Sequence, residues 1–202
     1  MRVIVPINGK NERMGELFKT PKHLLLYNGK QIISHICNYF GEVTILTNDD
    51  YIKEIGNLFY ASSIEIINIG KTNSQIETLL RYTEKIVDNN IMFVDCDIIP
   101  LTINSPLGNT VYCFENKLQY KQYSNYSAEN GHITACNEKE SVCKYAGAGV
   151  YYFESSDQFN KYAIGEKSIS GVVKKMIQDG IKFKLDCSNE ILRFGTLKDI
   201  IL

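Results

Sequence analysis

Residues 3–13 read VIVPINGKNER, a short β-branched apolar run that opens into a polar loop containing a glycine. A run of this kind is typical of a buried parallel strand that ends in a loop. Residues 32–40 follow with apolar side chains at helical spacing, and Gly41 marks the end of that predicted helix. The chain therefore begins with a strand, a loop and a helix, the first unit of an α/β fold.

The same alternation continues along the first hundred residues. We predict strands at 43–47, 64–69 and 91–94 and helices at 51–59 and 74–87. This order implies right-handed crossovers around a parallel sheet, with ligands bound beyond the carboxyl ends of its strands.

The second half of the chain changes character. Short strand-like runs separated by polar or glycine turns occur at 110–114, 121–126, 132–136 and 150–153, and a helix at 168–177 and a strand at 181–185 follow. We expect an α/β three-layer sandwich with a mostly parallel central sheet and a smaller mixed or antiparallel back half. Residues 1–202 would form one domain, with a nucleotide-binding half over about 1–100 and an acceptor-binding half over about 101–202.

Composition excludes several classes of partner. The 202 residues are 44% hydrophobic and carry 22 basic against 23 acidic side chains, a net charge of −1. Nucleic-acid polymers and anionic membranes are bound by a clustered positive excess, which this balance does not provide. No apolar run approaches the length of a membrane span, and the six cysteines lack the close pairs of zinc or redox sites. We expect a cytoplasmic protein with neither kind of partner.

Two segments of the first half carry cations suited to phosphate binding. In the loop 8–14, Gly9 permits close approach of backbone N–H groups to a phosphate, and Arg13 offers a planar fork of donors. In Thr20-Pro21-Lys22-His23, the proline stiffens the segment from which Lys22 projects. A polar turn with a solvated arginine, a solvated lysine and a structural His23 are the ordinary alternatives.

The segment Val94-Asp95-Cys96-Asp97 follows the predicted strand 91–94. Its two carboxylates straddle the exit of that strand, where a parallel sheet binds ligands, and carboxylate oxygens suit Mg²⁺ held together with substrate phosphates. A turn-forming aspartate is the alternative. Two charges beside an apolar strand cost stability unless they are used or solvated, which favours a functional site.

Taken in order, these segments resemble the signature of the sugar-phosphate nucleotidyltransferases. The family's opening motifs, A-G-x-G-T-R, P-K-x-L and G-K-P-x-I, are similar to residues 8–13, 21–24 and 29–33. Further segments resemble the family in the same order: 72–75, 94–97, 138–139, 146–153 and 194–199. The resemblance covers essentially the whole chain and implies a Rossmann-like fold of the glycosyltransferase-A type.

The resemblance implies a metal-assisted transfer of a nucleoside monophosphate from a nucleoside triphosphate to a small phosphorylated acceptor, releasing pyrophosphate, in the synthesis of surface-polysaccharide precursors. A cytidylyltransferase acting on a small phosphorylated alcohol or amide is as admissible as a thymidylyl- or uridylyltransferase acting on a sugar phosphate. The implied site residues are Lys22 and Arg13 in catalysis, Asn8, Gly9, Thr72, Ser74 and Gln75 toward the nucleotide, Glu138, Lys139 and Gly147 toward the acceptor, and Asp97 with Asp95 on Mg²⁺ or Mn²⁺.

The chain departs from the family pattern at Arg193-Phe194, where many members place a second metal-binding acid. Two other functions stay open. Asp95-Cys96-Asp97 is a D-x-D sequence, with which glycosyltransferases hold a nucleotide-sugar diphosphate through a cation, whereas Arg193 and Glu12 favour a non-catalytic nucleotide-binding regulatory domain. Aromatic residues such as Tyr123 and Tyr126 are more typical of packing than of a sugar platform. The base, the acceptor and the oligomeric state, a homodimer included, are left open.

Overall fold

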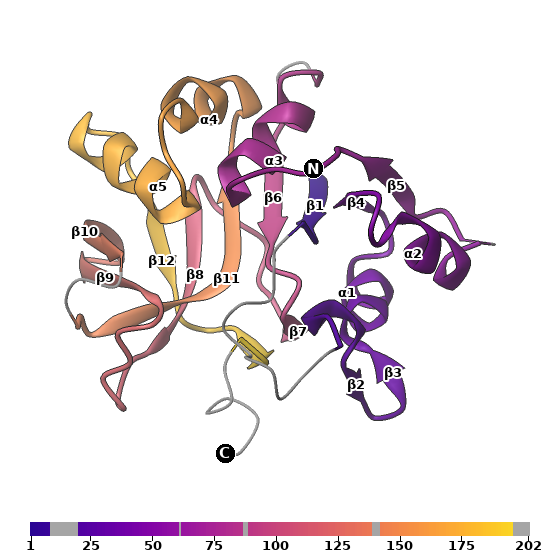
Figure 1. Cartoon of the computed structure of the whole chain (residues 1–202). Helices are drawn as coiled ribbons and strands as arrows, with labels where there is room; N and C mark the ends of the chain where they lie inside the picture. The colour runs from indigo at the N-terminus through magenta and orange to yellow at the C-terminus, as the bar shows by residue number, and fades with distance from the viewer. Residues whose placement is uncertain (9–19, 61, 87–88, 139–141, 196–202) are drawn as a thin grey trace.

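The structure, a computed structural model, describes residues 1–8, 20–60, 62–86, 89–138 and 142–195 (Figure 1). A nine-stranded sheet runs through it in the strand order β5-β4-β1-β6-β11-β8-β12-β10-β9. The first four strands of this order come from the first half of the chain and the other five from the second half. The two halves of the sequence are thus two halves of one sheet.

The front half of the sheet is parallel, as the sequence predicts. Its strands are β1 (Arg2–Pro6), β4 (Val43–Thr47), β5 (Glu65–Asn68) and β6 (Ile91–Val94). Three helices alternate with them, namely α1 (Ile32–Phe40), α2 (Ile52–Leu58) and α3 (Gln75–Thr83). A 3-10 turn, η2 (Lys22–Leu24), and a two-stranded hairpin, β2 (Leu26–Tyr27) with β3 (Lys30–Gln31), precede α1.

The back half of the sheet begins at β11 (Tyr145–Phe153), which runs antiparallel to β6. Beyond it lie β8 (Thr110–Glu115), β12 (Lys184–Asp186), β10 (His132–Glu138) and β9 (Ser124–Glu129). Only β12 with β8 is a parallel pair among the pairings of this half that the described residues make. The sheet is therefore mixed and not mostly parallel, and its back half is not the smaller one.

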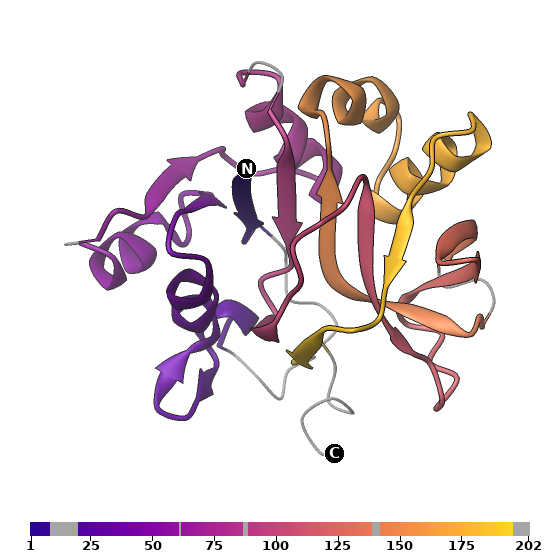
Figure 2. The same cartoon turned by 180° about the vertical axis from the view of Figure 1, so that it is seen from behind.

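Several back-half elements differ from the sequence-based prediction. The sequence does not predict α4 (Ser156–Ala163), nor the separate sheet of β7 (Ile98–Thr102) and β13 (Glu190–Arg193), which Figure 2 shows beneath the large sheet. The strand expected at 121–126 begins at Ser124, because the side chains of Asn116 and Asn125 bind the backbone of Tyr120 and hold the preceding residues in a turn. Helix α5 (Ile169–Gln178) lies where it was predicted.

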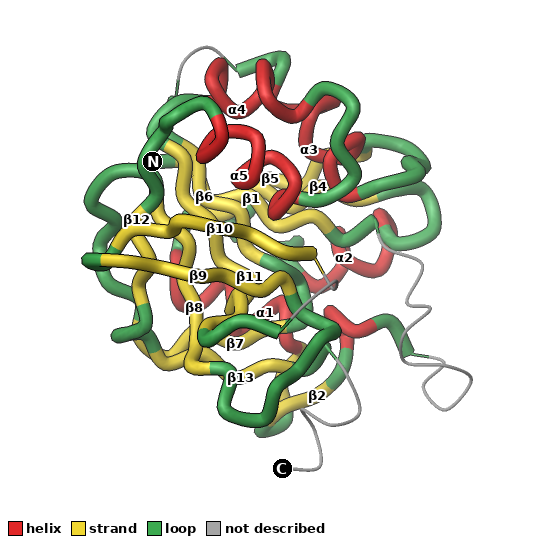
Figure 3. Tube along the Cα trace, turned by 90° about the vertical axis from the view of Figure 1, so that its left-hand side faces the viewer, coloured by secondary structure: helices red, strands yellow, loops and turns green. Residues whose placement is uncertain are grey.

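Alternate side chains of β1 point to opposite faces of the sheet, as the pleat of a strand requires. Val3 and Val5 pack with Ile33 of α1 in one hydrophobic cluster, whereas Ile4 packs with Leu79 of α3 in the other. Helices α1 and α2 thus cover one face, and α3, α4 and α5 cover the other, where Figure 3 shows them side by side. No helix in the described parts of the chain is both long and apolar enough to cross a membrane.

Candidate active site

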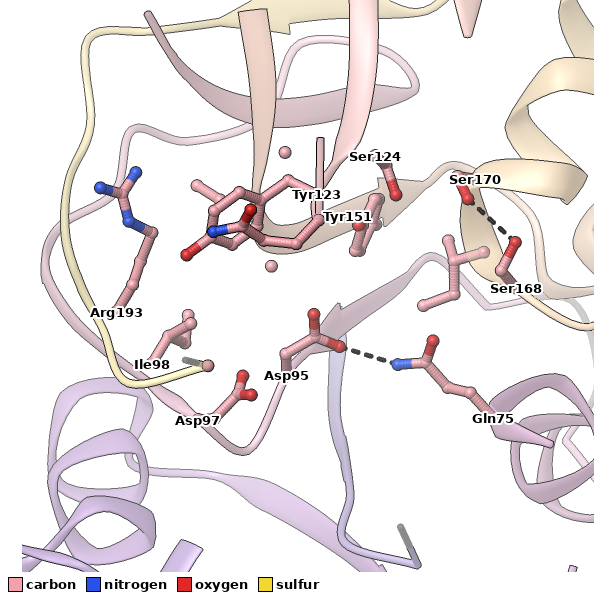
Figure 4. Close-up of a pocket in the computed structure, with 16 residues that line it drawn as sticks. Gln75, Asp95, Asp97, Ile98, Tyr123, Ser124, Tyr151, Ser168, Ser170 and Arg193 are labelled. Carbon is pink, nitrogen blue, oxygen red and sulfur yellow. Dashed lines mark hydrogen bonds between the residues drawn. The ribbon is translucent and has the colours of Figure 1, made fainter. Parts of the chain in front are cut away.

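Asp95 and Asp97 lie directly after the buried strand β6, at its carboxyl end. Both line a pocket between the two halves of the sheet, together with residues from the start of α3, from β11, from the loop before β9, from the start of α5 and from β13 (Figure 4). The pocket is at the end of the sheet where the parallel strands predict a ligand. The predicted location of the site is therefore matched by a real pocket.

Lys22 is buried, at 8% exposure, and its Nζ lies 2.9 Å from Oδ2 of Asp97. The same ammonium group donates a hydrogen bond of 2.7 Å to the backbone oxygen of Gly195. Turn η2 places this lysine at the site, 75 residues before its carboxylate partner in the sequence. The alternative of a solvated lysine is wrong, because the ammonium group is withdrawn from water and held by an opposite charge.

Asp95 is held from two directions. Its Oδ1 accepts a hydrogen bond of 2.7 Å from the side-chain amide of Gln75, the first residue of α3. Its backbone N–H donates to the carbonyl of Gly149 in β11, at 2.8 Å. Gly149 has a φ of +84°, and a Cβ there would lie 3.1 Å from Oδ2 of Asp95. A glycine is needed at this position because the backbone is left-handed and passes against the carboxylate.

Two residues predicted to bind nucleotide meet at the loops that follow β1 and β5. The Nδ2 group of Asn8 donates to Oγ1 of Thr72 at 2.9 Å and to the backbone oxygen of Gly70 at 2.7 Å. Thr72 also hydrogen-bonds Thr78 of α3, at 2.6 Å. Ser74 instead caps α3, because its Oγ accepts the N–H of Glu77 at 3.1 Å. The hydroxyl of Ser74 is thus engaged in holding the helix.

The residues predicted for the acceptor are only partly described. Gly147 of β11 lines the pocket, and a Cβ there would lie 3.3 Å from both the Tyr126 ring and the Tyr151 hydroxyl. Glu138 is the last residue of β10. Three further predicted site residues lie outside the described residues: Gly9, Arg13 and Lys139.

Arg193 of β13 also lines the pocket, and the sequence analysis assigns it no role in the site. Its guanidinium carbon lies 3.5 Å from the centre of the Phe114 ring and 5.7 Å from that of Tyr123. Tyr123 lines the pocket as well, whereas Tyr126 is fully buried and packs in the core. The packing interpretation is thus confirmed for Tyr126, and Tyr123 both packs edge-on against Phe114 and Tyr120 and faces the pocket.

No family model matches this sequence, and no curated protein matches it. Solved structures do. A nucleoside-diphosphate-sugar pyrophosphorylase from Vibrio cholerae aligns with a TM-score of 0.76 at 14% identity, over 98% of both chains. A CTP:phosphocholine cytidylyltransferase from Streptococcus pneumoniae aligns with a TM-score of 0.74 at 13% identity, over 99% of this chain and 96% of that one. An inositol-1-phosphate CTP transferase from T. maritima has a TM-score of 0.74 at 10% identity and covers 98% of this chain.

The chain has the nucleotidyltransferase fold. In this fold β6 delivers Asp95 and Asp97 to the pocket, and β11 closes against them through Gly149. The three similar structures share the architecture of both halves of the sheet, since each alignment spans nearly the whole chain.

The carboxylates in the pocket of this nucleotidyltransferase fold suit Mg²⁺ that is held together with water and substrate phosphates. No group of three or more histidine, cysteine, aspartate or glutamate side chains gathers among the described residues. Mg²⁺ is commonly held by one or two carboxylates, with water and substrate phosphates as the other ligands. Asp95 and Asp97 supply that number of carboxylates, and both face the pocket (Figure 4). Cys96 is a poor ligand for Mg²⁺, because this ion prefers oxygen donors to sulfur.

Proposed function

We propose that the protein is a metal-dependent nucleotidyltransferase. It would transfer a nucleoside monophosphate from a nucleoside triphosphate to a small phosphorylated acceptor and release pyrophosphate. The observation that carries the proposal is the ion pair between the buried Lys22 and the partly buried Asp97, just beyond the carboxyl end of β6. A partly buried ion pair adds little net stability compared with apolar packing, so a pair whose carboxylate lines a ligand pocket favours a role in handling charge.

The reaction needs positioning and neutralisation of charge more than it needs a base. An oxygen of the acceptor phosphate attacks the α-phosphorus, and the bond from that phosphorus to the bridging oxygen of the β-phosphate breaks. Pyrophosphate then leaves with the electron pair of that bond. Lys22 supplies a fixed positive charge beside Asp97, where phosphates of both substrates have to approach each other. A bound Mg²⁺ or Mn²⁺, held by Asp97 and Asp95, supplies further neutralisation of the phosphate oxygens.

The rest of the site divides between the two halves of the sheet. Asn8, Thr72 and Gln75 would hold the nucleotide, because they surround the carboxyl ends of the parallel strands. Gly9 and Arg13 remain predictions for the triphosphate, and Ser74 would act through the helix that it caps. Gly147, with Glu138 and Lys139 as predictions from sequence, would serve the acceptor. We treat residues 1–202 as one Rossmann-like catalytic domain of the glycosyltransferase-A type that acts in the cytoplasm on precursors of surface polysaccharides.

The test is a pyrophosphate-release screen with Mg²⁺. It crosses CTP, UTP, dTTP and GTP with phosphosugars, phosphocholine and other phosphorylated metabolites, and it includes a Lys22→Ala variant with a matched Lys30→Ala control, since Lys30 is exposed. The proposal expects pyrophosphate from at least one pair of substrates and none above background from the Lys22 variant. Binding of nucleotides without turnover on any acceptor would support a regulatory domain, and transfer from a nucleotide-sugar would support a glycosyltransferase.

A further inference from the structure

Arg193 stands at the opposite end of the pocket from Gln75 and Ser168, with Asp95 and Asp97 between them (Figure 4). Strand β13 sets its place, because Arg193 pairs with Ile98 of β7 and the next N–H, of Phe194, donates to the carbonyl of Asp97 at 2.7 Å. Figure 4 shows the guanidinium end beside Tyr123 and turned away from the Asp97 carboxylate. The cation therefore belongs to the back half of the site.

Aromatic rings, and no acidic groups, hold this guanidinium in place. Its carbon lies 3.5 Å from the centre of the Phe114 ring, and Tyr123 stands edge-on to that ring, with centroids 5.4 Å apart. No described residue forms an ion pair or a hydrogen bond with the Arg193 side chain. Stacking uses the flat face of a guanidinium and leaves the N–H donors around its edge available.

A fixed cation with unused donors in a substrate pocket is a site for an anion. The planar fork of donors matches the two oxygens of a carboxylate or a phosphate. The same geometry disfavours a cationic group, since Arg193 already covers one face of the Phe114 ring, which an ammonium group would otherwise use. The charge at this end of the pocket thus selects among acceptors.

We infer that Arg193 binds a second anionic group of the acceptor, a carboxylate or a phosphate separate from the phosphate that attacks the nucleotide. This inference rests on the proposed nucleotidyltransferase function and narrows its acceptor class. The preferred acceptors are small phosphorylated molecules with an additional acidic group, ahead of neutral sugar phosphates and well ahead of phosphocholine.

The test compares acceptors that differ in their second group. 3-Phosphoglycerate carries a carboxylate, phosphoserine carries a carboxylate beside an ammonium group, glucose 1,6-bisphosphate carries a second phosphate, glucose 1-phosphate carries none of these, and phosphocholine carries a cation. Arg193→Ala is expected to raise the KM of the acidic acceptors about ten- to a hundredfold, the usual size of a lost charge-assisted pair, and to leave the KM of the nucleotide and of glucose 1-phosphate within about twofold. Arg193→Lys keeps the charge without the fork and should recover part of the loss.

Lys117→Ala is the matched control, because it removes a nearby exposed cation that pairs with Glu115 outside the pocket. Melting temperatures of all variants show whether they are folded. A uniform loss on every acceptor, or a raised nucleotide KM, would mean that Arg193 contacts the reacting phosphates and would overturn the inference.

Calorimetric binding of 3-phosphoglycerate and phosphocholine keeps the inference separate from the proposed function. If no acceptor yields pyrophosphate, the proposed function fails, but tighter binding of 3-phosphoglycerate that Arg193→Ala abolishes still supports an anion site. Equal binding of the two ligands to the unmodified protein would overturn that site whether or not turnover is seen.

Discussion

The two halves of the sheet build their sides of the pocket by different means. The front half uses charged and amide side chains that hold one another, Lys22 with Asp97 and Gln75 with Asp95. The back half uses backbone approach and aromatic surface, with Gly149 against Asp95 and Arg193 on Phe114. The front half is thus suited to phosphates and metal, which any substrate pair of this reaction brings, and the back half to the features that distinguish one acceptor from another.

Loss of the front-half cation should have the largest effect. Lys22→Ala is expected to lower kcat/KM about a thousandfold, the usual size of a lost preorganised charge contact in a transition state. The fall should be similar on every acceptor, because the front half handles phosphates common to all of them. Rates of pyrophosphate release measure it, and unchanged release by a folded variant would contradict the role of Lys22.

The front half should also set the acid sensitivity of the fold. Burial lowers the pKa of His23 from 6.5 to about 4. Between pH 6.5 and pH 4, His23 therefore binds a proton in the unfolded chain but not in the folded chain. The free energy of unfolding therefore has its full value above pH 6.5, and it falls by about 3 kcal/mol as the pH drops to 4. Urea unfolding at a series of pH values measures this loss.

His23→Phe should remove most of that pH dependence, since the His23 ring packs edge-on against Tyr51, at 5.0 Å between centroids, and a phenyl ring fits the same contact. His132→Gln is the control, because His132 is exposed. A pH dependence that persists in His23→Phe and disappears in the control would assign the effect to the wrong half of the molecule.

In the back half, Asn125 should matter for the loop that carries Tyr123. Its fully buried side chain donates to the backbone oxygen of Tyr123 at 2.8 Å and accepts from Asn116 at 2.8 Å and from the N–H of Cys143 at 3.1 Å. Asn125→Ala is expected to cost about 2 kcal/mol of unfolding free energy, because buried polar groups lose their partners. It should raise the KM of the acceptor severalfold and leave that of the nucleotide unchanged. An equal rise in the KM of the acceptor and in the KM of the nucleotide would contradict the assignment of acceptor binding to the back half.

The smallest effect should appear where the halves touch. Gly149 and Gly180 have nearly the same backbone, with φ of +84° and +82°, but only Gly149 has atoms within 4 Å of an added Cβ. Gly149→Ala should therefore cost about 1 kcal/mol more than Gly180→Ala, and it alone should weaken metal binding by displacing Asp95. Denaturant unfolding and metal titration measure the two effects. Equal costs would mean that backbone strain alone decides, without the contact to Asp95.

The sequence predicts the front half well and the back half poorly, for a physical reason. The apolar pattern reports elements such as β6 and α1 directly, because β6 is apolar throughout and α1 repeats one buried face. The pair β7 and β13 shows no such signal, since Pro100 interrupts the apolar run of β7 and the partner of each strand lies about ninety residues away along the chain. Strand β9 begins late because Asn116 and Asn125 hold the turn before it, and that contact exists only in the folded chain.

The sequence by itself determined the parallel front half and the chemistry of Asp95, Asp97 and Lys22, because residue type and local spacing are enough for both. Only the tertiary structure decided that Lys22 is buried against Asp97, that Gly149 presses on Asp95 and that Arg193 stacks on Phe114. Each of these contacts joins segments far apart in the chain. The tertiary structure decides which charges are paired and which face a ligand. Local sequence does not determine these contacts, because the residues that make them are far apart in the chain.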